Sequence, residues 1–506
     1  MSGPLVAGAA ALLRSAEPTL SAVQLKNRLI TSSVPNAALA GRVSSGARLD
    51  VQNLVNPLGS IPVLTPLGPI ARVHGLESSA QSLVFSVKGT SEVDGSVQSE
   101  IPVTWTKAAG PGTLTFTPLS DNQVRANFSV EGLYKLIASA TSGGITTQLE
   151  RTVVVGTSVA VSPSQLMARW TFNETSGAPQ DSSGQGRHGT LIDGPTPDAG
   201  PGSEAALRFT GTLSSMKFNA PAPSQVTLAG WVRMDGAGNS IFPRMINMPA
   251  FYLFLGRDVD GMADANIGSV KFLANWTGTD GVWHSPQRLV TNNTWYHVAA
   301  TYDGSKGLRE LPRLYLNGRE LEVGAQTAPA GTLELVAGSG YLGNNEEKTR
   351  ALQGRLSDVR IYGRPLGSEE IALLAREANL QDLRRWEVVV TSATPTDAVL
   401  GLRLADGRLP GGTLTAVWRE ITGPGSPSFL STNGTQATVR IGASGPHTIA
   451  VDLYENEVML SRQVTLTLPG TAAPPVLPGF VRSPGDRLAA VGSSITLEVE
   501  ATGSPP

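Results

Sequence analysis

The chain has 506 residues, with 39 Lys and Arg against 41 Asp and Glu and a formal net charge of −2. Because there is no surplus of basic residues to neutralise a phosphate backbone, nucleic acid is excluded as a partner. The absence of cysteine excludes disulfides, thiol nucleophiles and cysteine-ligated zinc.

The composition favours several β domains. Gly and Pro contribute 56 and 35 residues, against 12 Phe, 8 Trp and 8 Tyr, which is typical of short strands joined by turns. At roughly 100–200 residues per domain, the length predicts about three to five domains. No apolar run reaches the ~18 residues of a membrane span, so we expect no span.

Two helices are predicted at the start of the chain. Residues 4–16 are apolar and Ala-rich, with Pro4 near the beginning, where its missing N–H does no harm. Residues 21–32 follow, with Ser21 and Gln24 spaced as a capping box. Two helices cannot form a useful core alone, so they indicate a remnant of a larger body.

Residues 1–13 resemble the segment that follows the nucleophile of subtilisin-like serine peptidases, with Met1 on the methionine of the family's Gly-Thr-Ser-Met motif. Residues 21–27 and 46–51 are similar to the family's second C-terminal helix and final strand. The resemblance implies that the catalytic Ser, His and Asp belong to a peptidase domain upstream of Met1. Ser2 is a poor substitute, because a nucleophile needs a base and an orienting group. We therefore expect no enzyme activity from the chain as given.

Short strands with period-2 alternation follow, and one module is used twice. The intervals from Trp105 to the next Gly-Pro-Gly and to Gly132 equal those from Trp418 to its Gly-Pro-Gly and to Gly445. This pattern predicts an immunoglobulin-like sandwich in both places. Both copies resemble the polycystic-kidney-disease-like (PKD) repeats of bacterial exoproteins, which implies spacer or adhesive modules. His447 is interpreted as a packed histidine, the alternative being a ligand.

A longer run of strands and turns begins at about Trp170, and Asn317-Gly318 is a strong hairpin signal within it. The segments from Trp170 to Leu366 resemble, in order and wording, the laminin-G-like, concanavalin A-like jelly roll. A short helix with Ser368 as its N-cap is predicted to end the unit. Glu346 and Glu347 are adjacent and would point to opposite faces of a strand, so hydrolysis by a carboxylate pair is not expected.

The jelly-roll resemblance implies one structural calcium ion, held by Asp181 and Asp358. Ser357 stands where the family usually has Asp, which weakens such a site because calcium takes six to eight oxygen ligands. The alternative is that Asp181 only caps a turn. Residues 258–266 form an acidic loop that is interpreted as a solvated hairpin and not as a cation site.

Trp276, Trp283 and His284 bracket a polar, Gly-rich loop. Because aromatic faces suit contact with sugars, these residues are the candidate ligand-binding site. The alternative is that one or both tryptophans belong to the hydrophobic core.

Together these observations predict a mostly β, multi-domain chain: a jelly-roll sandwich flanked by immunoglobulin-like sandwiches, after a two-helix remnant of an α/β peptidase domain. The expected function is non-catalytic binding or adhesion to an extracellular polysaccharide or protein surface, as the C-terminal part of a secreted subtilisin-like endopeptidase. The alternative is a purely structural stalk. The expected localisation is extracellular or at the cell surface. The predicted domains are 1–57 (peptidase remnant), 58–161 (first sandwich), 164–378 (jelly roll), 386–468 (second sandwich) and 469–506 (linker and truncated immunoglobulin-like domain).

Overall fold

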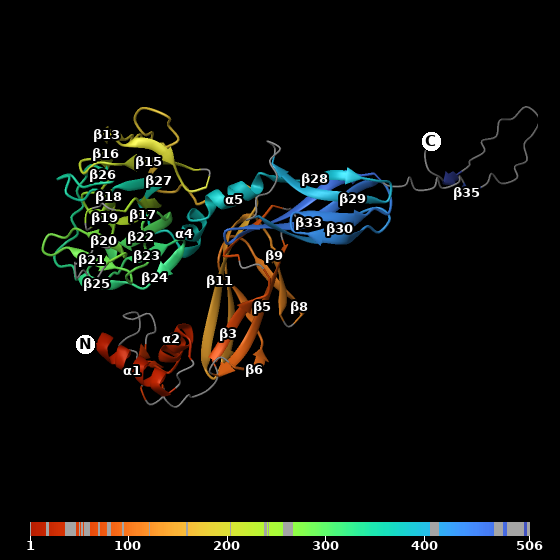
Figure 1. The fold of residues 1–506 in the computed structure, drawn as a ribbon, viewed down its shortest axis with the longest axis horizontal. Coiled ribbons are helices and arrows are strands. Elements are labelled where there is room, and N and C mark those ends of the chain that lie inside the picture. The colour runs from red at the N-terminus through yellow and green to blue at the C-terminus, as the bar shows by residue number, and fades with distance from the viewer. Residues whose placement is uncertain are drawn as a thin grey trace, which may run out of the picture. The chain divides into compact units, whose positions relative to one another are not determined.

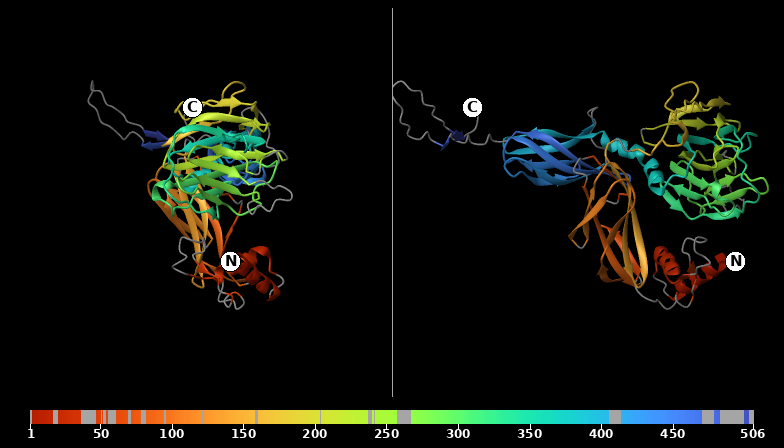
Figure 2. Two further views of the ribbon diagram at one scale, coloured as in Figure 1. Left: turned by 90° about the vertical axis from the view of Figure 1, so that its left-hand side faces the viewer. Right: turned by 180° about the vertical axis from the view of Figure 1, so that it is seen from behind.

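The computed structural model divides into two units, residues 1–383 with 456–460, and residues 384–455 with 461–506. Each is described by itself (Figures 1 and 2). The residues that the structure describes are 2–16, 20–35, 47–49, 51, 54, 61–68, 71–77, 82–93, 96–120, 122–157, 160–202, 204–236, 240, 242–256, 267–404, 414–469, 479–482 and 500–502.

The first unit begins with the two predicted helices. They are α1 (Ser2–Ala16) and α2 (Ala22–Thr31), followed by the short strands β1 (Val34–Pro35) and β2 (Ala47–Arg48). The capping box is formed as predicted, since the Ser21 N–H donates to Gln24 Oε1 (2.7 Å) and the Gln24 N–H donates to Ser21 Oγ (3.3 Å). Among the described residues, no helix has both the length and the apolar character needed to cross a membrane.

The first sandwich consists of two layers whose strands pair antiparallel, except that β4 and β11 pair in parallel. One contains β3, β5, β9 and β8 with β6 beside β5, and the other contains β4, β11, β10 and β7. The strands are β3 (Ile61–Pro66), β4 (Val73–Leu76), β5 (Ser82–Val93), β6 (Ser96–Ile101), β7 (Thr104–Ala109), β8 (Leu114–Ser120), β9 (Gln123–Phe128), β10 (Gly132–Ser142) and β11 (Ile145–Val155).

The second unit contains another sandwich. Neighbouring strands follow the orders β28-β29-β32-β31 and β30-β33-β34, of which the last begins at 458, before this unit resumes at 461. The strands are β28 (Trp386–Ala393), β29 (Asp397–Leu404), β30 (Thr415–Thr422), β31 (Ser428–Asn433), β32 (Gln436–Arg440), β33 (Gly445–Glu455), β34 (Val458–Leu468), and, further along, β35 (Gly479–Arg482) and β36 (Glu500–Thr502).

Corresponding glycines have the same backbone role in the two sandwiches. Gly110 and Gly423 both have positive φ, 125° and 159°. A Cβ at Gly110 would meet the ring of Tyr134 at 2.4 Å, and one at Gly423 would meet the ring of His447 at 2.5 Å. His447 is fully buried, which agrees with its interpretation as a packed histidine.

The jelly roll lies in the first unit and is built from two sheets. Their strand orders are β14-β15-β27-β17-β22-β23-β24, with β12 also paired to β27, and β13-β16-β26-β18-β19-β20-β21-β25. The elements are β12 (Leu166–Trp170), β13 (Thr190–Ile192), β14 (Thr196–Ala199), β15 (Ala205–Phe209), β16 (Ser215–Ala220), β17 (Gln225–Met234), β18 (Arg244–Asn247), β19 (Phe251–Leu255), β20 (Val270–Ala274), β21 (Gly281–His284), β22 (Tyr296–Asp303), η2 (Gly304–Lys306), β23 (Arg313–Leu316), β24 (Arg319–Leu321), β25 (Gly324–Thr327), β26 (Gly338–Leu342) and β27 (Gly354–Tyr362).

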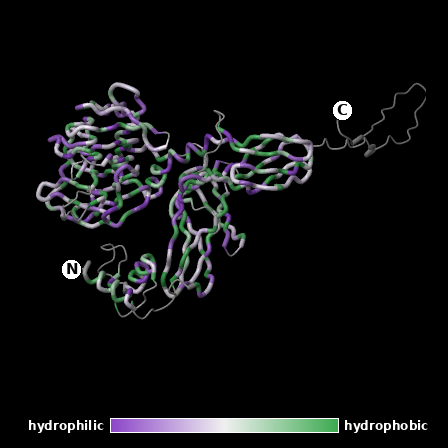
Figure 3. The backbone as a smooth tube through the Cα atoms, in the orientation of Figure 1, coloured by the Kyte–Doolittle hydropathy of each residue, from purple (hydrophilic) through white to green (hydrophobic). Residues whose placement is uncertain are grey.

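Aromatic rings fill the space between these two sheets. Phe251, Phe272 and Trp283 come from one sheet and Tyr302 from the other, and the centroid of the Trp283 ring lies 5.5 Å from that of Tyr302. Hydrophobic and hydrophilic residues are interspersed along the strands (Figure 3), because successive side chains point to opposite faces of a sheet. Each sheet therefore has a core face and an outer face.

A hairpin turn and a helix N-terminus in the jelly roll test two local predictions. Asn317 and Gly318 have φ values of 50° and 75° and connect β23 to β24, as the hairpin signal predicted. Two helices end the domain, α4 (Ser368–Leu374) and α5 (Glu377–Arg384). The N-cap of α4 is Gly367 and not Ser368, and the Gly367 N–H donates to Glu370 Oε2 (3.0 Å).

We expect Trp283→Ala to destabilise the jelly roll by about 3–5 kcal/mol, because it removes a large buried side chain and leaves a cavity. Hydrogen exchange of the β19–β21 amides in the full chain should become faster. Val336→Ala is the control, since Val336 is 58% exposed. Unchanged exchange in Trp283→Ala would contradict the place of this indole in the core.

Candidate functional site

A bulge in β27 determines what the outer face of its sheet presents. The pairing of β17 with β27 shifts register between Ala229, opposite Arg360, and Trp231, opposite Ser357. Asp358 has a φ of 41°, while its neighbour Val359 faces the core. A bulge places an extra residue in one strand and re-aims its side chain. Asp358 therefore lies on the outer face beside Arg360.

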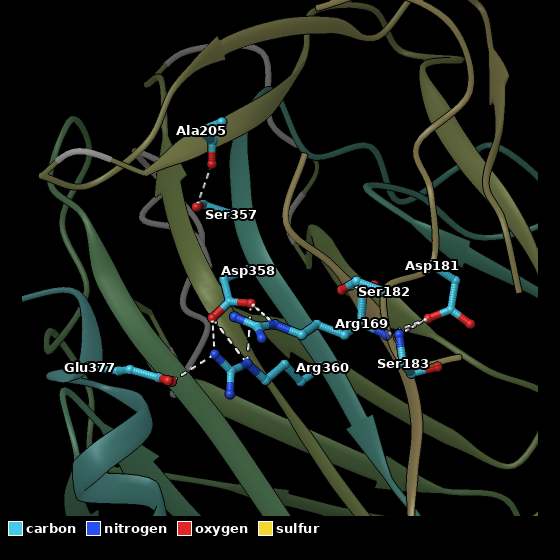
Figure 4. Close-up of polar contacts among 9 residues, drawn as sticks. All are labelled: Arg169, Asp181, Ser182, Ser183, Ala205, Ser357, Asp358, Arg360 and Glu377. Carbon is cyan, nitrogen blue, oxygen red and sulfur yellow. Dashed lines mark hydrogen bonds and ion pairs between the residues drawn. The ribbon is translucent and has the colours of Figure 1, made fainter. Parts of the chain in front are cut away.

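Asp358 lies between two arginines. Arg169 of β12 is directly opposite Arg360 of β27. Asp358 Oδ1 accepts from Arg169 Nε (2.8 Å) and Asp358 Oδ2 accepts from Arg360 Nη2 (2.6 Å), while Arg360 Nη2 also lies 2.9 Å from Glu377 Oε2 of α5 (Figure 4). Like charges directly opposite each other repel, so this carboxylate is what lets the two strands pair here.

The ion pairs decide the protonation of Asp358. Its side chain is 12% exposed, and burial raises the pKa of its carboxyl, but Arg360 and Arg169 outweigh burial and hold that pKa below its usual value. Burial alone would lower the pKa of Arg360, but the carboxylates of Asp358 and Glu377 outweigh burial and raise that pKa above its usual value. Asp358 and Arg360 are therefore both charged at neutral pH.

A cavity of about 130 Å³ opens beside this bridge. It combines two arginines, three carboxylates, an amide and an indole, and we call it the charged pocket. The residues that line it are Arg169, Glu204, Trp231, Asp358, Arg360, Leu374, Glu377, Ala378 and Gln381.

Glu204 differs from the other two carboxylates of the charged pocket. Among the described residues, its carboxylate accepts no hydrogen bond and makes no ion pair, although Asp358 and Glu377 are both held by arginine. Burial raises the pKa of Glu204, Asp358 and Glu377 raise it further, and Arg169 and Arg360 oppose the shift. Glu204 is half-buried and thus remains an available acceptor.

Trp231 is a half-buried indole on the pocket wall. The ring of His297 lies edge-on to it, with 5.4 Å between the ring centroids and an interplanar angle of 74°. Burial lowers the pKa of His297 to about 3, so a neutral imidazole supports the indole. The orientation of Trp231 is therefore held by packing on β22.

The predicted sugar-stacking platform is contradicted by the burial of its tryptophans. Trp276 is 6% exposed and Trp283 is 1% exposed, and both belong to the core cluster. His284 is half-buried, with Nδ1 2.9 Å from the Ser285 carbonyl oxygen. Because Trp283 and His284 are successive residues of β21, their side chains point to opposite faces. The predicted acidic loop, residues 258–266, lies outside the described residues.

The predicted calcium ligands do not fit a calcium ion. Asp181 Oδ1 accepts from the backbone N–H groups of Arg169 and Ser183, each at 2.9 Å, and Asp181 Oδ2 accepts from that of Arg187 at 2.9 Å. Burial raises the pKa of Asp181, but hydrogen bonds, those of Ser183 first, outweigh it and lower the pKa. Asp181 thus caps a turn, as the alternative held.

Asp358 is unsuitable for calcium for a different reason, since guanidinium groups occupy both of its oxygens. Arg169 lies between the two predicted ligands, giving its backbone N–H to Asp181 and its side chain to Asp358 (Figure 4). Ser357 Oγ donates to the Ala205 carbonyl (2.6 Å). In the part of the chain that is described, no three His, Asp or Glu residues are grouped to hold a metal.

Sequence reasoning missed Arg169, Glu204, Trp231, Arg360 and Glu377. Two of them, Trp231 and Arg360, were seen only as parts of the segments that resemble a jelly roll. A usable signal was the run Ser357-Asp358 between the core residues Leu356 and Val359, where two residues stand in place of one. Such a break in period-2 alternation is typical of a bulge.

We expect Asp358→Asn to reduce the stability of the jelly roll by about 3 kcal/mol, because it leaves two buried or half-buried guanidinium groups without their shared carboxylate. Hydrogen exchange of the β12 and β27 amides in the full chain measures this change. Glu322→Gln, at an exposed carboxylate, is the control and should change nothing.

The effect of Asp358→Asn should depend on pH. The lowered folded-state pKa of Asp358 means that its contribution is complete above the unfolded-state pKa of about 3.9 and is lost as the pH falls through the folded-state value. The stability difference between wild type and Asp358→Asn should therefore narrow below about pH 4. A difference that stays constant down to strongly acidic pH would contradict the ion-pair bridge.

We expect calcium to leave the melting temperature of the full chain unchanged, because the predicted ligands already have donors as partners. Thermal unfolding with excess calcium and with a chelator checks this. A ligand bound only by the folded state raises the melting temperature, so a clear upward shift with calcium, absent with magnesium, would overturn the conclusion that the site does not fit.

Comparison with protein families gives one match. Residues 210–372 match a model described as the concanavalin A-like lectin/glucanases superfamily, which is less than half of the chain. A search of the curated proteins found no match.

Comparison with solved structures gives weak likenesses. Domain 4 of AbnA, an extracellular arabinanase from Geobacillus stearothermophilus, in complex with arabinotriose, is 20% identical, with a TM-score of 0.30 and coverage of 42% of this chain and 98% of that one. The binding domain of botulinum neurotoxin serotype D is 12% identical, with a TM-score of 0.32 and coverage of 67% and 80%. The binding domain of Paraclostridial Mosquitocidal Protein 1 is 12% identical, with a TM-score of 0.33 and coverage of 58% and 81%.

At these TM-scores, the likenesses support no conclusion about function. The matched residues fall within the two-sheet jelly roll that the structure shows. The chain is thus mostly β, and its residues 210–372 belong to a concanavalin A-like jelly roll.

Proposed function

We propose that the chain is a non-catalytic binding protein whose jelly roll binds an extracellular glycan through the charged pocket. The observation that carries this proposal is the composition of that pocket, a half-buried indole beside planar polar side chains. An aromatic ring offers an apolar face, and a few fixed polar groups give orientation and specificity. The match to a superfamily of lectins and glucanases supports the same class of ligand.

The size of the charged pocket sets the size of what it can hold. At about 130 Å³ it is smaller than the roughly 300–1,000 Å³ of a drug-sized ligand site. We therefore expect it to take one sugar unit or the end of a chain, with the rest of the glycan lying over the sheet.

Binding is favoured over hydrolysis by the state of Asp358. A glycosidase needs one free carboxylate as nucleophile or base and one protonated carboxyl as acid. Both oxygens of Asp358 accept from guanidinium groups, which weakens it as a nucleophile or base, and Glu377 also pairs with Arg360. Glu204 alone cannot supply both roles.

The wider setting is part of the same proposal. The resemblance of residues 1–57 to subtilisin-like peptidases supports a parent that is a secreted serine endopeptidase, and the PKD-like repeats support an extracellular or cell-surface location. In that setting the modules would hold the enzyme on a polysaccharide or protein surface. The alternative is a structural or adhesive stalk whose jelly roll has no small ligand.

We expect the full chain to bind a subset of glycans on an array, and Trp231→Ala to lose at least about tenfold in affinity for them, because a stacked base or sugar on an aromatic ring is worth roughly 1–3 kcal/mol. Leu335→Ala, at a side chain that is 46% exposed, is the control. Titration of the best glycan measures both variants.

Three results would count against this function. An array without binding at high protein concentration would favour the structural stalk, and release of new reducing ends from a bound glycan would show that the jelly roll is catalytic. Equal binding by wild type and Trp231→Ala would show that the glycan binds at a place other than the charged pocket.

A further inference from the structure

The charged pocket has an excess of negative charge. Its carboxylates are Glu204, Asp358 and Glu377, and its cations are Arg169 and Arg360. Both arginines are engaged by Asp358, and Arg360 also by Glu377. The unneutralised charge therefore resides on Glu204, whose carboxylate has no hydrogen-bond or ion-pair partner among the described residues.

An acceptor of this kind favours a cationic partner. A carboxylate that is partly withdrawn from water loses hydrogen bonds to water, and only a donor from the protein or a ligand can replace them. A hydrogen bond from a charged donor is about twice as strong as one from a neutral donor. Trp231 lines the same pocket, and the face of an indole attracts cations. Two features of the wall thus select the same chemistry.

We propose that the charged pocket binds the protonated amino group of an amino sugar, with the Glu204 carboxylate as its acceptor and Trp231 beside the sugar ring. This proposal rests on the proposed glycan-binding function and specifies the sugar.

The remaining wall residues favour an amino sugar over a lysine side chain. Gln381 has both a donor and an acceptor, and Arg169, which also lines the pocket, has N–H groups besides the one bound to Asp358. A sugar hydroxyl both donates and accepts, so one ring can use all of these groups. A lysine side chain has three donors and no acceptor, which leaves the donors of Gln381 and Arg169 without a partner.

The test compares two oligomers of equal length, one of glucosamine and one of N-acetylglucosamine, titrated into the full chain by calorimetry. The pH is set between the pKa of Glu204 and that of the sugar amine, so that both groups are charged. We expect the glucosamine oligomer to bind at least about tenfold more tightly, since the acetylated nitrogen carries no charge.

Glu204→Gln is the decisive variant, because it keeps the size of the side chain and removes its charge. It should reduce the preference for glucosamine to near unity, while Glu322→Gln, at an exposed carboxylate, keeps it. Thermal unfolding of both variants should match wild type, which separates loss of charge from loss of fold.

Several other results would contradict the amino-sugar assignment. Equal binding of the two oligomers, or an unchanged preference in Glu204→Gln, would overturn the amino-sugar assignment. Tighter binding of a lysine-rich peptide than of the glucosamine oligomer would also overturn it. Trp231-dependent binding of neutral glycans alone would leave the proposed function standing and reject this inference, whereas binding of no glycan at all would reject both.

Discussion

The outer face of the jelly roll depends on one bridge, in which a single carboxylate neutralises two arginines. Arg169 and Arg360 face each other across β12 and β27, an arrangement that repulsion would disfavour without Asp358. The bridge needs the bulge in β27. With regular alternation of side chains between the two faces, no additional residue would place a carboxylate between Arg169 and Arg360. The bulge in turn needs a close approach of β17, where a Cβ at Gly230 would lie 3.1 Å from Val359 Cγ2. A side chain at that position would therefore press on Val359, the residue next to Asp358.

The same bridge positions the helix that closes the charged pocket. Arg360 is 6% exposed and pairs with Glu377 in the first turn of α5. A buried guanidinium with two carboxylate partners has its charge satisfied, whereas removing either partner would leave charge that is costly to bury. The wall formed by α5 and the floor formed by β27 are thus parts of one electrostatic unit, and Glu204 is the carboxylate that this unit leaves over.

Much of the fold could be predicted from local signals, and much of the site could not. The capping box at Ser21 and Gln24 and the hairpin at Asn317-Gly318 are formed as predicted, because each depends on residues a few positions apart. Strand register decides whether the side chains of Trp276 and Trp283 lie on the core face or the outer face of the sheet. The Gly-rich sequence around them does not indicate that register. The role of Asp358 depends on a bulge and on Arg169, which is 189 residues away. Long-range pairing and bulges were the missing information.

Arginines contact both acidic residues at the place where family resemblance implied a cation. Arg169 binds Asp181 through its backbone and Asp358 through its side chain, so one residue joins the turn to the strand, as a bound metal ion would. A guanidinium cannot be removed by a chelator, and it stays protonated at physiological pH. It also has a fixed geometry, whereas calcium accepts oxygens from many directions. Arg169 thus joins the turn to the strand, and the Glu204 carboxylate has no hydrogen-bond or ion-pair partner among the described residues.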